Sequence, residues 1–320
     1  MLDTAAVRRH WLFEPNLKAT WKPSRKAALE LNYGWSTYLP GLLQTIGYRE
    51  NTDPLFVAEG NPDLKNCHAN DLSLKLSVVD PTRQLSLGTT LSLNVSDRQT
   101  VSALAYDPVT GIYTSRPMTA KGSRVLGLQV NYDHGLGEKW RLQNDLKMNA
   151  ERHYGYLTLL PDETERTLNR QSALHPKDKL LLTFDINWLQ TKSFVEIDAN
   201  RLHFSASPEQ NTTLLSNKIG VESEAKWRNF EFSTSLTERM RRGYTMSDMN
   251  RDWLEWDAKI TWKVLSSKAR ITLELRDILN SETVYWSDQT AYQQVTQWAG
   301  YRHHWIGISF AYHLDAKKKD

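Results

Sequence analysis

The chain has 320 residues and a formal net charge of +3, and 40% of its residues are apolar. No run approaches the roughly 18 apolar residues that a membrane-spanning helix needs, and the balanced charge gives no reason to expect a nucleic-acid partner. The single cysteine, Cys67, excludes an internal disulfide framework and a thiolate cluster for a metal. The unusual feature is 12 Trp and 13 Tyr against 8 Phe, because these amphipathic aromatics are preferred where apolar surroundings meet water.

Apolar residues recur at every second position along most of the chain. This period is the signature of β-strands, and about ten residues are enough for a tilted strand to cross a bilayer. A phase slip near Asn200 predicts a β-bulge. The predicted strands, about 13 in number, cover residues 11–21, 29–35, 72–78, 85–95, 126–132, 140–148, 182–188, 195–204, 219–227, 230–240, 254–262, 269–275 and 306–314.

The predicted connections alternate between short and long. Outer-membrane β-barrels have short periplasmic turns at one end and long extracellular loops at the other. The short connections are residues 22–26, 81–83, 134–138, 190–192, 228–229 and 265–267, and the long ones are about 38–69, 96–122, 152–178, 206–215, 242–251 and 277–300.

Many aromatic residues share the phase of the aliphatic residues and lie beside a short turn or the C-terminus. A ring of aromatics at one height is typical of the interface between a membrane and water. The other phase of the strands is polar, as expected for the wet interior of a barrel. The predicted interface girdle consists of Trp21, Tyr132, Trp140, Trp188, Trp227, Phe230, Trp262 and Tyr312.

The sequence therefore predicts an all-β, antiparallel meander transmembrane barrel. A soluble antiparallel sandwich would also alternate, with its apolar phase buried. The alternation of short and long connections, the strand lengths and the one-ended ring of aromatics favour the membrane.

Three segments resemble the C-terminal barrel of a TonB-dependent outer-membrane receptor of the Bacteroidota type. Residues 60–65, Gly-Asn-Pro-Asp-Leu-Lys, are similar to a family segment that precedes a descending strand, although Asn66 and Cys67 replace its usual Pro-Glu. Residues 277–280 are similar to the motif at the end of the family's penultimate strand. The final strand, 301–314, has the family's alternating aromatics, whereas the tail 315–320 departs from the family's usual ending on an aromatic residue.

The resemblance implies a protein of the bacterial outer membrane that imports a large nutrient (a siderophore, glycan or peptide) and is not an enzyme. Implied partners are outer-membrane lipid and lipopolysaccharide, the barrel-assembly machinery, a surface lipoprotein and, through a plug, TonB; no cofactor is implied. Residues 1–320 would form the C-terminal part of the barrel, without plug or signal peptide. Since bacterial barrels have even strand numbers, an odd count predicts a fragment. A fourteenth strand within residues 1–10 would instead permit a small complete porin or structural barrel.

No catalytic constellation and no metal site are expected. Arg239, Arg241 and Arg242 could bind an anionic ligand or lipopolysaccharide, although a solvated charge cluster is the favoured interpretation. The best candidates for ligand binding are aromatics in long loops, which could stack on a sugar or a siderophore or pack loop against loop. These are Tyr154, Tyr156, Tyr285, Trp286, Tyr292 and Trp298.

Overall fold

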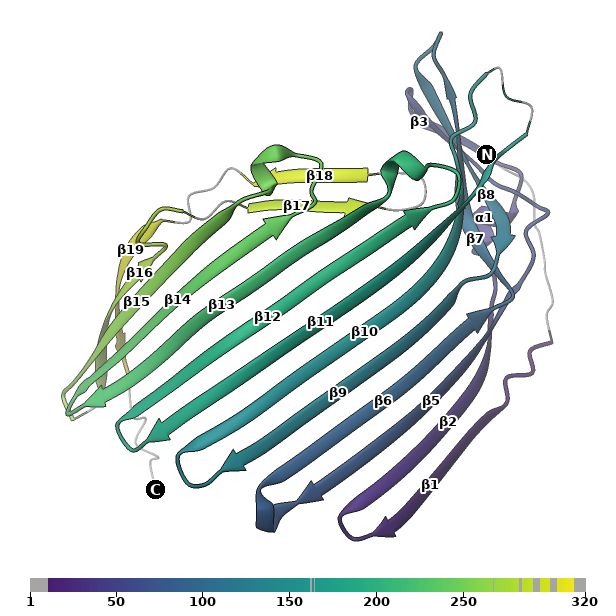
Figure 1. Cartoon of the computed structure of the whole chain (residues 1–320). Coiled ribbons are helices and arrows are strands. Elements are labelled where there is room, and N and C mark those ends of the chain that lie inside the picture. The colour runs from purple at the N-terminus through teal and green to yellow at the C-terminus, as the bar shows by residue number, and fades with distance from the viewer. Residues whose placement is uncertain are drawn as a thin grey trace, which may run out of the picture.

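A computed structural model describes residues 11–161, 163, 165–266, 268–281, 284–289, 294–299 and 304–313. Most of them form one 13-stranded antiparallel sheet, with the strands side by side in chain order (Figure 1). The strands across it are β1 (Asn16–Ser24), β2 (Ala27–Tyr38), β5 (Cys67–Asp80), β6 (Leu85–Ser96), β9 (Arg124–Leu136), β10 (Trp140–Tyr156), β11 (Leu168–Ile186), β12 (Leu189–Phe204), β13 (Thr212–Trp227), β14 (Phe230–Arg242), β15 (Asp252–Val264), β16 (Ala269–Arg276) and β19 (Trp305–Tyr312).

Each of these strands contains most of one predicted alternating segment, so the all-β fold class and the meander are confirmed. Two connections were predicted wrongly. The short turn between β11 and β12 lies at residues 187–188 and not at 190–192, because Ile186 already pairs with Leu189. Residues 152–178 are not one long loop, since β10 and β11 stay paired up to Tyr156 and Leu168. Charged residues and Pro176 hide the alternation there.

The predicted β-bulge near Asn200 is also wrong. The register between β12 and β13 is the same on both sides of it, from Glu196 opposite Lys218 to Ala199 opposite Leu215. The ladder between β11 and β12 merely skips His175 and Pro176, and proline has no N–H to donate. The apparent slip arises because the polarity of the two faces exchanges beyond Asn200, where Leu202 and Phe204 are buried on the face that is polar below.

Short turns connect the strands at one end of the sheet, which we call the short-turn end. Arg228 has φ of 53°, and Leu265 and Ser266 have φ of 52° and 54°, the left-handed conformation that tight turns require. At this end, the ammonium of Lys26 in the turn between β1 and β2 and the hydroxyl of Thr82 in the turn after β5 bind the carboxylate of Asp80, the last residue of β5, at 2.8 and 2.6 Å. These two contacts lower the pKa of Asp80 from 3.8 to about 2.

Additional structure gathers at the opposite, long-loop end. A four-stranded sheet has the order β3 (Arg49–Asp53), β4 (Phe56–Glu59), β8 (Ile112–Lys121) and β7 (Arg98–Asp107), next to the single-turn helix α1 (Leu42–Thr45). A separate hairpin joins β17 (Val284–Gln289) to β18 (Gln294–Ala299). No helix among the described residues is long and apolar enough to cross a membrane.

Residues 60–65, the first segment that resembles the receptor family, anchor the first long loop to the four-stranded sheet. Buried Asn61 donates from Nδ2 to the carbonyl of Pro117 at 2.9 Å and accepts from the backbone N–H of Asp63 at 3.1 Å. A Cβ on Gly60 would lie 1.7 Å from the carbonyl oxygen of Ile46, so this close approach requires glycine.

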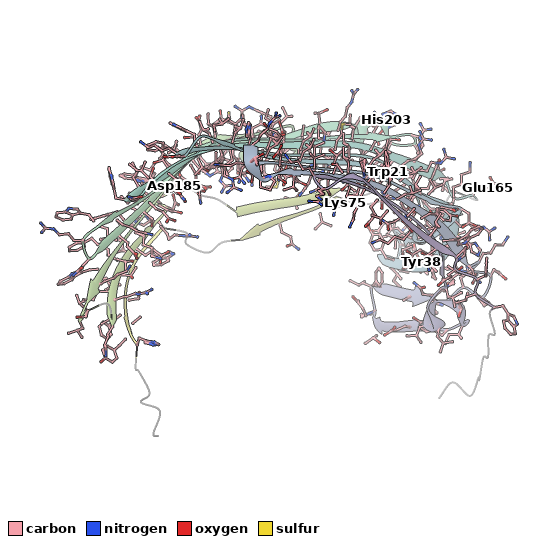
Figure 2. The ribbon with its side chains drawn as sticks, turned by 90° about the horizontal axis from the view of Figure 1, so that it is seen from below. Trp21, Tyr38, Lys75, Glu165, Asp185 and His203 are labelled. Atoms are coloured by element: carbon pink, nitrogen blue, oxygen red, sulfur yellow. The ribbon has the colours of Figure 1, made fainter. Side chains whose placement is uncertain are left out.

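The large sheet curves into an arch and does not close (Figure 2). Its edge strands are β1 and β19, which pair only with β2 and β16. Lys75 of β5 points to the concave side of the arch, which we call the inward face (Figure 2). Leu72 is three residues away in the same strand and so points to the opposite, convex side, the outward face. Leu91, Leu128 and their cross-strand partners share this outward face. The β17–β18 hairpin lies on the concave side of the arch (Figure 2).

Candidate functional site

The inward face is polar because the second phase of each strand is polar. Residues directly opposite one another on paired antiparallel strands share a face. Glu30 is opposite Lys75, Lys179 is opposite Glu196, and Lys259 is opposite Glu274. The concave wall therefore carries charges of both signs, interleaved from strand to strand.

An ion-pair network crosses β11, β12 and β13 on this wall. Glu196, 7% exposed, accepts from Lys177 at 3.0 Å and from Lys218 at 3.1 Å. Lys177 also binds Asp198 at 3.1 Å, and Asp198 lies 2.8 Å from His175 Nε2. Each carboxylate thus has two cationic or hydrogen-bonding partners, as a buried carboxylate requires. Lys177 and His175 were missed in the sequence because they lie in a segment interpreted as a loop.

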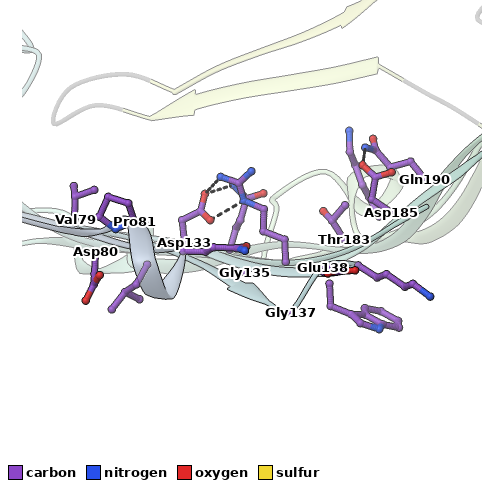
Figure 3. Close-up of a pocket in the computed structure, with 17 residues that line it drawn as sticks. Val79, Asp80, Pro81, Asp133, Gly135, Gly137, Glu138, Thr183, Asp185 and Gln190 are labelled. Carbon is purple, nitrogen blue, oxygen red and sulfur yellow. Dashed lines mark hydrogen bonds and ion pairs between the residues drawn. The ribbon is translucent and has the colours of Figure 1, made fainter. Parts of the chain in front are cut away.

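A hollow of about 600 Å³ opens on the wall near the short-turn end (Figure 3). In it the guanidinium of Arg141 makes a two-pronged contact with Asp133 at 2.6 and 2.7 Å, and Gln143 donates to the same carboxylate at 2.9 Å. Gln190 donates to Asp185 at 2.7 Å. The hollow is open, and the carboxylates of Asp133 and Asp185 are occupied by hydrogen-bond donors, which suits passage of polar solutes better than tight capture of a cation.

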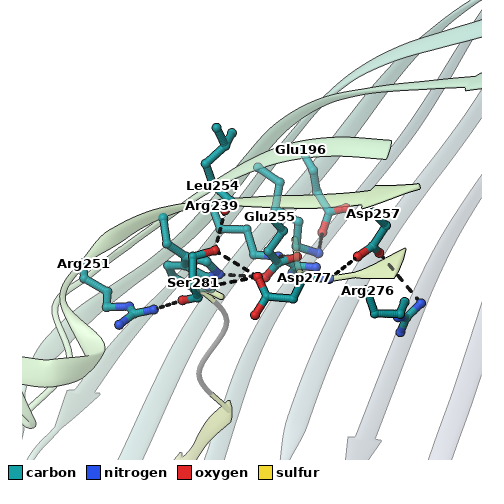
Figure 4. Close-up of polar contacts among 11 residues, drawn as sticks. Glu196, Arg239, Arg251, Leu254, Glu255, Asp257, Arg276, Asp277 and Ser281 are labelled. Atoms are coloured by element: carbon teal, nitrogen blue, oxygen red, sulfur yellow. Dashed lines mark hydrogen bonds and ion pairs between the residues drawn. The ribbon is translucent and has the colours of Figure 1, made fainter. Parts of the chain in front are cut away.

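Polar contacts near the long-loop end hold residues 277–280, the second segment that resembles the receptor family (Figure 4). Asp277, 2% exposed, has φ of 46° and accepts from the backbone N–H of Ser281 at 2.9 Å. Its own N–H donates to Asp257 at 2.8 Å, and Ile278 donates to the carbonyl of Trp256 at 2.8 Å. Residues 277–280 therefore end β16 and bind the chain back to β15, a structural role.

The described aromatics among those proposed as ligand sites lie in two different elements. Tyr154 and Tyr156 are not in a loop: they belong to β10, opposite Arg170 and Leu168, and the Tyr156 hydroxyl donates to the carbonyl of Thr119 at 3.4 Å. Tyr285 lies directly opposite Trp298 in the β17–β18 hairpin, and Trp286 follows Tyr285. Tyr292 lies outside the described residues. The five aromatics among the described residues therefore come from two separate elements, β10 and the β17–β18 hairpin.

The eight residues of the predicted girdle lie on the outward face, or in the turn in the case of Trp188, towards the short-turn end. Phe230 stacks on Trp262 with ring centres 5.8 Å apart and on Trp227 at 6.3 Å. Trp140 contacts Phe184 at 4.7 Å, and the Tyr132 hydroxyl lies 2.9 Å from His134 Nδ1. Their role at a membrane interface stays a prediction. The other members, Trp21 and Tyr312, lie on the edge strands β1 and β19.

The three arginines of β14 are already occupied. Arg239 binds Glu255 at 2.7 Å, Arg242 binds Asp252 at 2.6 Å, and the guanidinium of Arg241 lies 5.0 Å from the centre of the Trp253 ring. This matches a charge cluster with internal partners rather than an open anion site. Among the residues that the structure describes, no group of three or more His, Cys, Asp and Glu side chains could hold a metal.

Comparison with known proteins decides the class of protein. The model of the outer membrane protein beta-barrel family matches residues 6–312. The chain belongs to this family. No curated protein matches the sequence. Among solved structures, LpxR from Salmonella typhimurium shares 9% sequence identity, with 78% of this chain and 88% of that chain covered and a TM-score of 0.23; a score this low does not indicate a shared fold.

Membership of this family places the protein in the bacterial outer membrane. The outward face then meets lipid, and the inward face belongs to the interior of a barrel. The soluble sandwich considered from the sequence is excluded. In barrels of this kind the short turns face the periplasm, so the long-loop end is the extracellular end.

Proposed function

We propose that this outer-membrane β-barrel chain is part of the wall of a TonB-dependent importer for a large nutrient, and that it transports rather than catalyses. The proposal includes a plug that couples to TonB and is not formed by residues 1–320. It also includes outer-membrane lipid, the barrel-assembly machinery and a surface lipoprotein as partners.

The width of the arch carries the proposal. The 13 strands curve smoothly, yet β1 and β19 remain apart (Figure 2). A barrel in which 13 strands form only an arch needs a larger total, and barrels of about 22 strands are the transporters whose lumen holds a plug. A porin of about 14 strands would have only one strand between β1 and β19, whereas these two edge strands lie at opposite ends of the open arch (Figure 2). The open arch therefore favours the wider barrel.

The inward wall supports transport of a polar cargo. Its charges alternate in sign and are largely compensated, as in the network of Lys177, Glu196 and Lys218. Such a wall provides hydrogen-bonding partners along its height without one site that would bind the cargo tightly. A siderophore, a glycan or a peptide all fit this chemistry, with Tyr285, Trp286, Tyr292 and Trp298 as candidate stacking residues.

Uptake in cells tests the proposal. Accumulation of labelled ferric siderophores, oligosaccharides and peptides is measured in the parent strain, in a strain without this gene and in a strain without TonB. We expect one substrate class to be lost in both mutants. Liposomes that contain the protein should not swell in solutions of small sugars, whereas size-dependent swelling without an energy source would identify a porin and contradict the proposal.

A further inference from the structure

The outward face changes character at the extracellular end of β9 to β12. Cross-strand partners place Arg124, Arg152, Ser172 and His203 in one outward row and Leu126, Ala150, Leu174, Arg201 and Thr213 in the row below it. Arg124, Arg152, Arg201 and His203 are all exposed. We call Arg124, Arg152 and Arg201 the arginine belt.

The belt is electrostatically unfavourable within the chain alone. Arg124 and Arg152 are direct cross-strand partners, and like charges in this position destabilise a sheet. Among the described residues, none of the three arginines has a carboxylate within ion-pair distance, whereas Arg141, Arg239 and Arg242 elsewhere in the sheet each have one. In the row above, Arg170 has a buried Nε without a hydrogen-bond partner.

A hollow of about 480 Å³ lies on the same patch. Its outward-pointing lining consists of Ser172, Leu174, Arg201, His203 and Thr213. Two hydroxyl groups, a guanidinium and an imidazole thus surround a recess next to the Arg124–Arg152 pair. Figure 2 shows His203 on the convex side of the arch, away from the barrel interior.

Below the recess the outward side chains are mostly apolar, although the carboxylate of Asp178 lies opposite Ile197. Leu126, Met148, Leu174 and Ile197 are 46%, 40%, 42% and 51% exposed, and all of them point outward. A ligand that fits both parts needs an anionic head at the height of the belt and hydrocarbon below it. Arginine binds phosphate with two parallel hydrogen bonds, and hydroxyl groups can complete the shell.

We propose that the arginine belt and its recess bind the phosphorylated sugar head of an outer-leaflet glycolipid of the lipid A type, with the acyl chains lying on the outward apolar side chains of β9 to β12, which include Leu126, Met148, Leu174 and Ile197. The site is on the outside of the barrel, so it does not depend on the proposed import function. The bound phosphate supplies the negative charge that the described part of the chain does not place within ion-pair distance of Arg124 and Arg152.

Binding of purified lipid A to the full chain in detergent micelles tests this site. The probes are diphosphoryl lipid A, the same lipid after removal of its phosphates, and inorganic phosphate. The test variant is R124Q/R152Q/R201Q, and the matched control R25Q/R83Q/R228Q removes the same charge from exposed turns at the short-turn end. R124K/R152K/R201K keeps the charge but loses the paired donors. Circular dichroism verifies that each variant retains its β-structure.

We expect the dissociation constant of diphosphoryl lipid A to rise about tenfold or more in the test variant. The control should bind like the parent, and the lysine variant should fall between them. Equal binding of dephosphorylated lipid A, or full displacement by millimolar inorganic phosphate, would overturn a glycolipid site. Should the glutamine variant not fold, a lysine variant that binds as tightly as the parent would overturn the two-pronged recognition on its own.

Discussion

A carboxylate lies on the lipid-facing side of the sheet at Asp178. Its cross-strand partners, Leu146 and Ile197, are outward residues, and its position is near the middle of β11. Asn144, on the same face of β10, donates from Nδ2 to Asp178 Oδ1 at 2.6 Å. Charged residues on the lipid face of barrels are destabilising, so this amide is the compensation that the neighbouring strand provides.

Replacing Asn144 should show how much the unpaired carboxylate of Asp178 destabilises the protein. We expect Asn144→Leu to lower the free energy of unfolding by about 1–3 kcal/mol, because Asp178 loses its donor in an apolar setting. The double variant N144L/D178L should recover this loss or exceed the parent in stability. Urea unfolding in lipid vesicles measures both variants.

Asn149→Leu is the control, since Asn149 is an exposed inward residue of the same strand. We expect a change of less than about 0.5 kcal/mol there. If N144L/D178L were as unstable as N144L alone, Asp178 would not be the group that Asn144 compensates.

At the scale of the strand, β12 shows where the lipid-facing band ends. Its outward residues are Val195 and Ile197 below Asn200 and Arg201 and His203 above it, with no change of register. The exchange of polarity therefore reflects the end of the apolar layer and not a kink in the strand. The arginine belt lies at this boundary.

Spin labels along β12 test whether the lipid-facing band ends near Asn200 and whether the strand continues there without a bulge. In a Cys67→Ser background, single cysteines at residues 193–204 carry a nitroxide, and its collisions with oxygen and with a water-soluble nickel complex are measured. We expect oxygen to dominate at 195 and 197 and nickel to dominate at 201 and 203, because oxygen concentrates in lipid. Labels at 194 and 196, which point inward, are the control. A shift of the oxygen maxima to even positions beyond 200 would instead mean a bulge.

The period of the apolar residues was sufficient to predict the strands but not their upper ends. Outward residues alternate with inward ones as apolar and polar only while the outward face meets lipid. The pattern therefore fails where a strand passes from lipid into water, as after Asn200 and between Arg152 and Asp178. For this reason Lys177, His175 and the arginine belt were missed. A continuing period of two with reversed polarity, Arg201 and His203 against Leu202 and Phe204, was the available signal. The assignment of Tyr154 and Tyr156 to a strand rather than a loop could not be predicted, because it depends on which strands extend beyond the membrane.

At the scale of the whole molecule, the direction of the edge strands limits how the barrel can close. All neighbours in the sheet are antiparallel, so the first and the thirteenth strands, β1 and β19, run in the same direction. Direct closure would pair them in parallel, whereas an odd number of intervening strands would keep every pair antiparallel, as in bacterial barrels. The gap between the edges in Figure 2 agrees with the second arrangement.

Cysteine cross-linking distinguishes the two arrangements. In a Cys67→Ser background, T20C/S309C places one thiol on the inward face of each edge strand, and T272C/S309C places both on the paired strands β16 and β19. A disulfide requires Cα atoms within about 7 Å, which directly opposed strand residues satisfy. We therefore expect mild oxidation in outer membranes to cross-link T272C/S309C and to leave T20C/S309C reduced. Equally fast cross-linking of T20C/S309C would mean that the 13 strands close on themselves, and it would remove the wide barrel from which import was proposed.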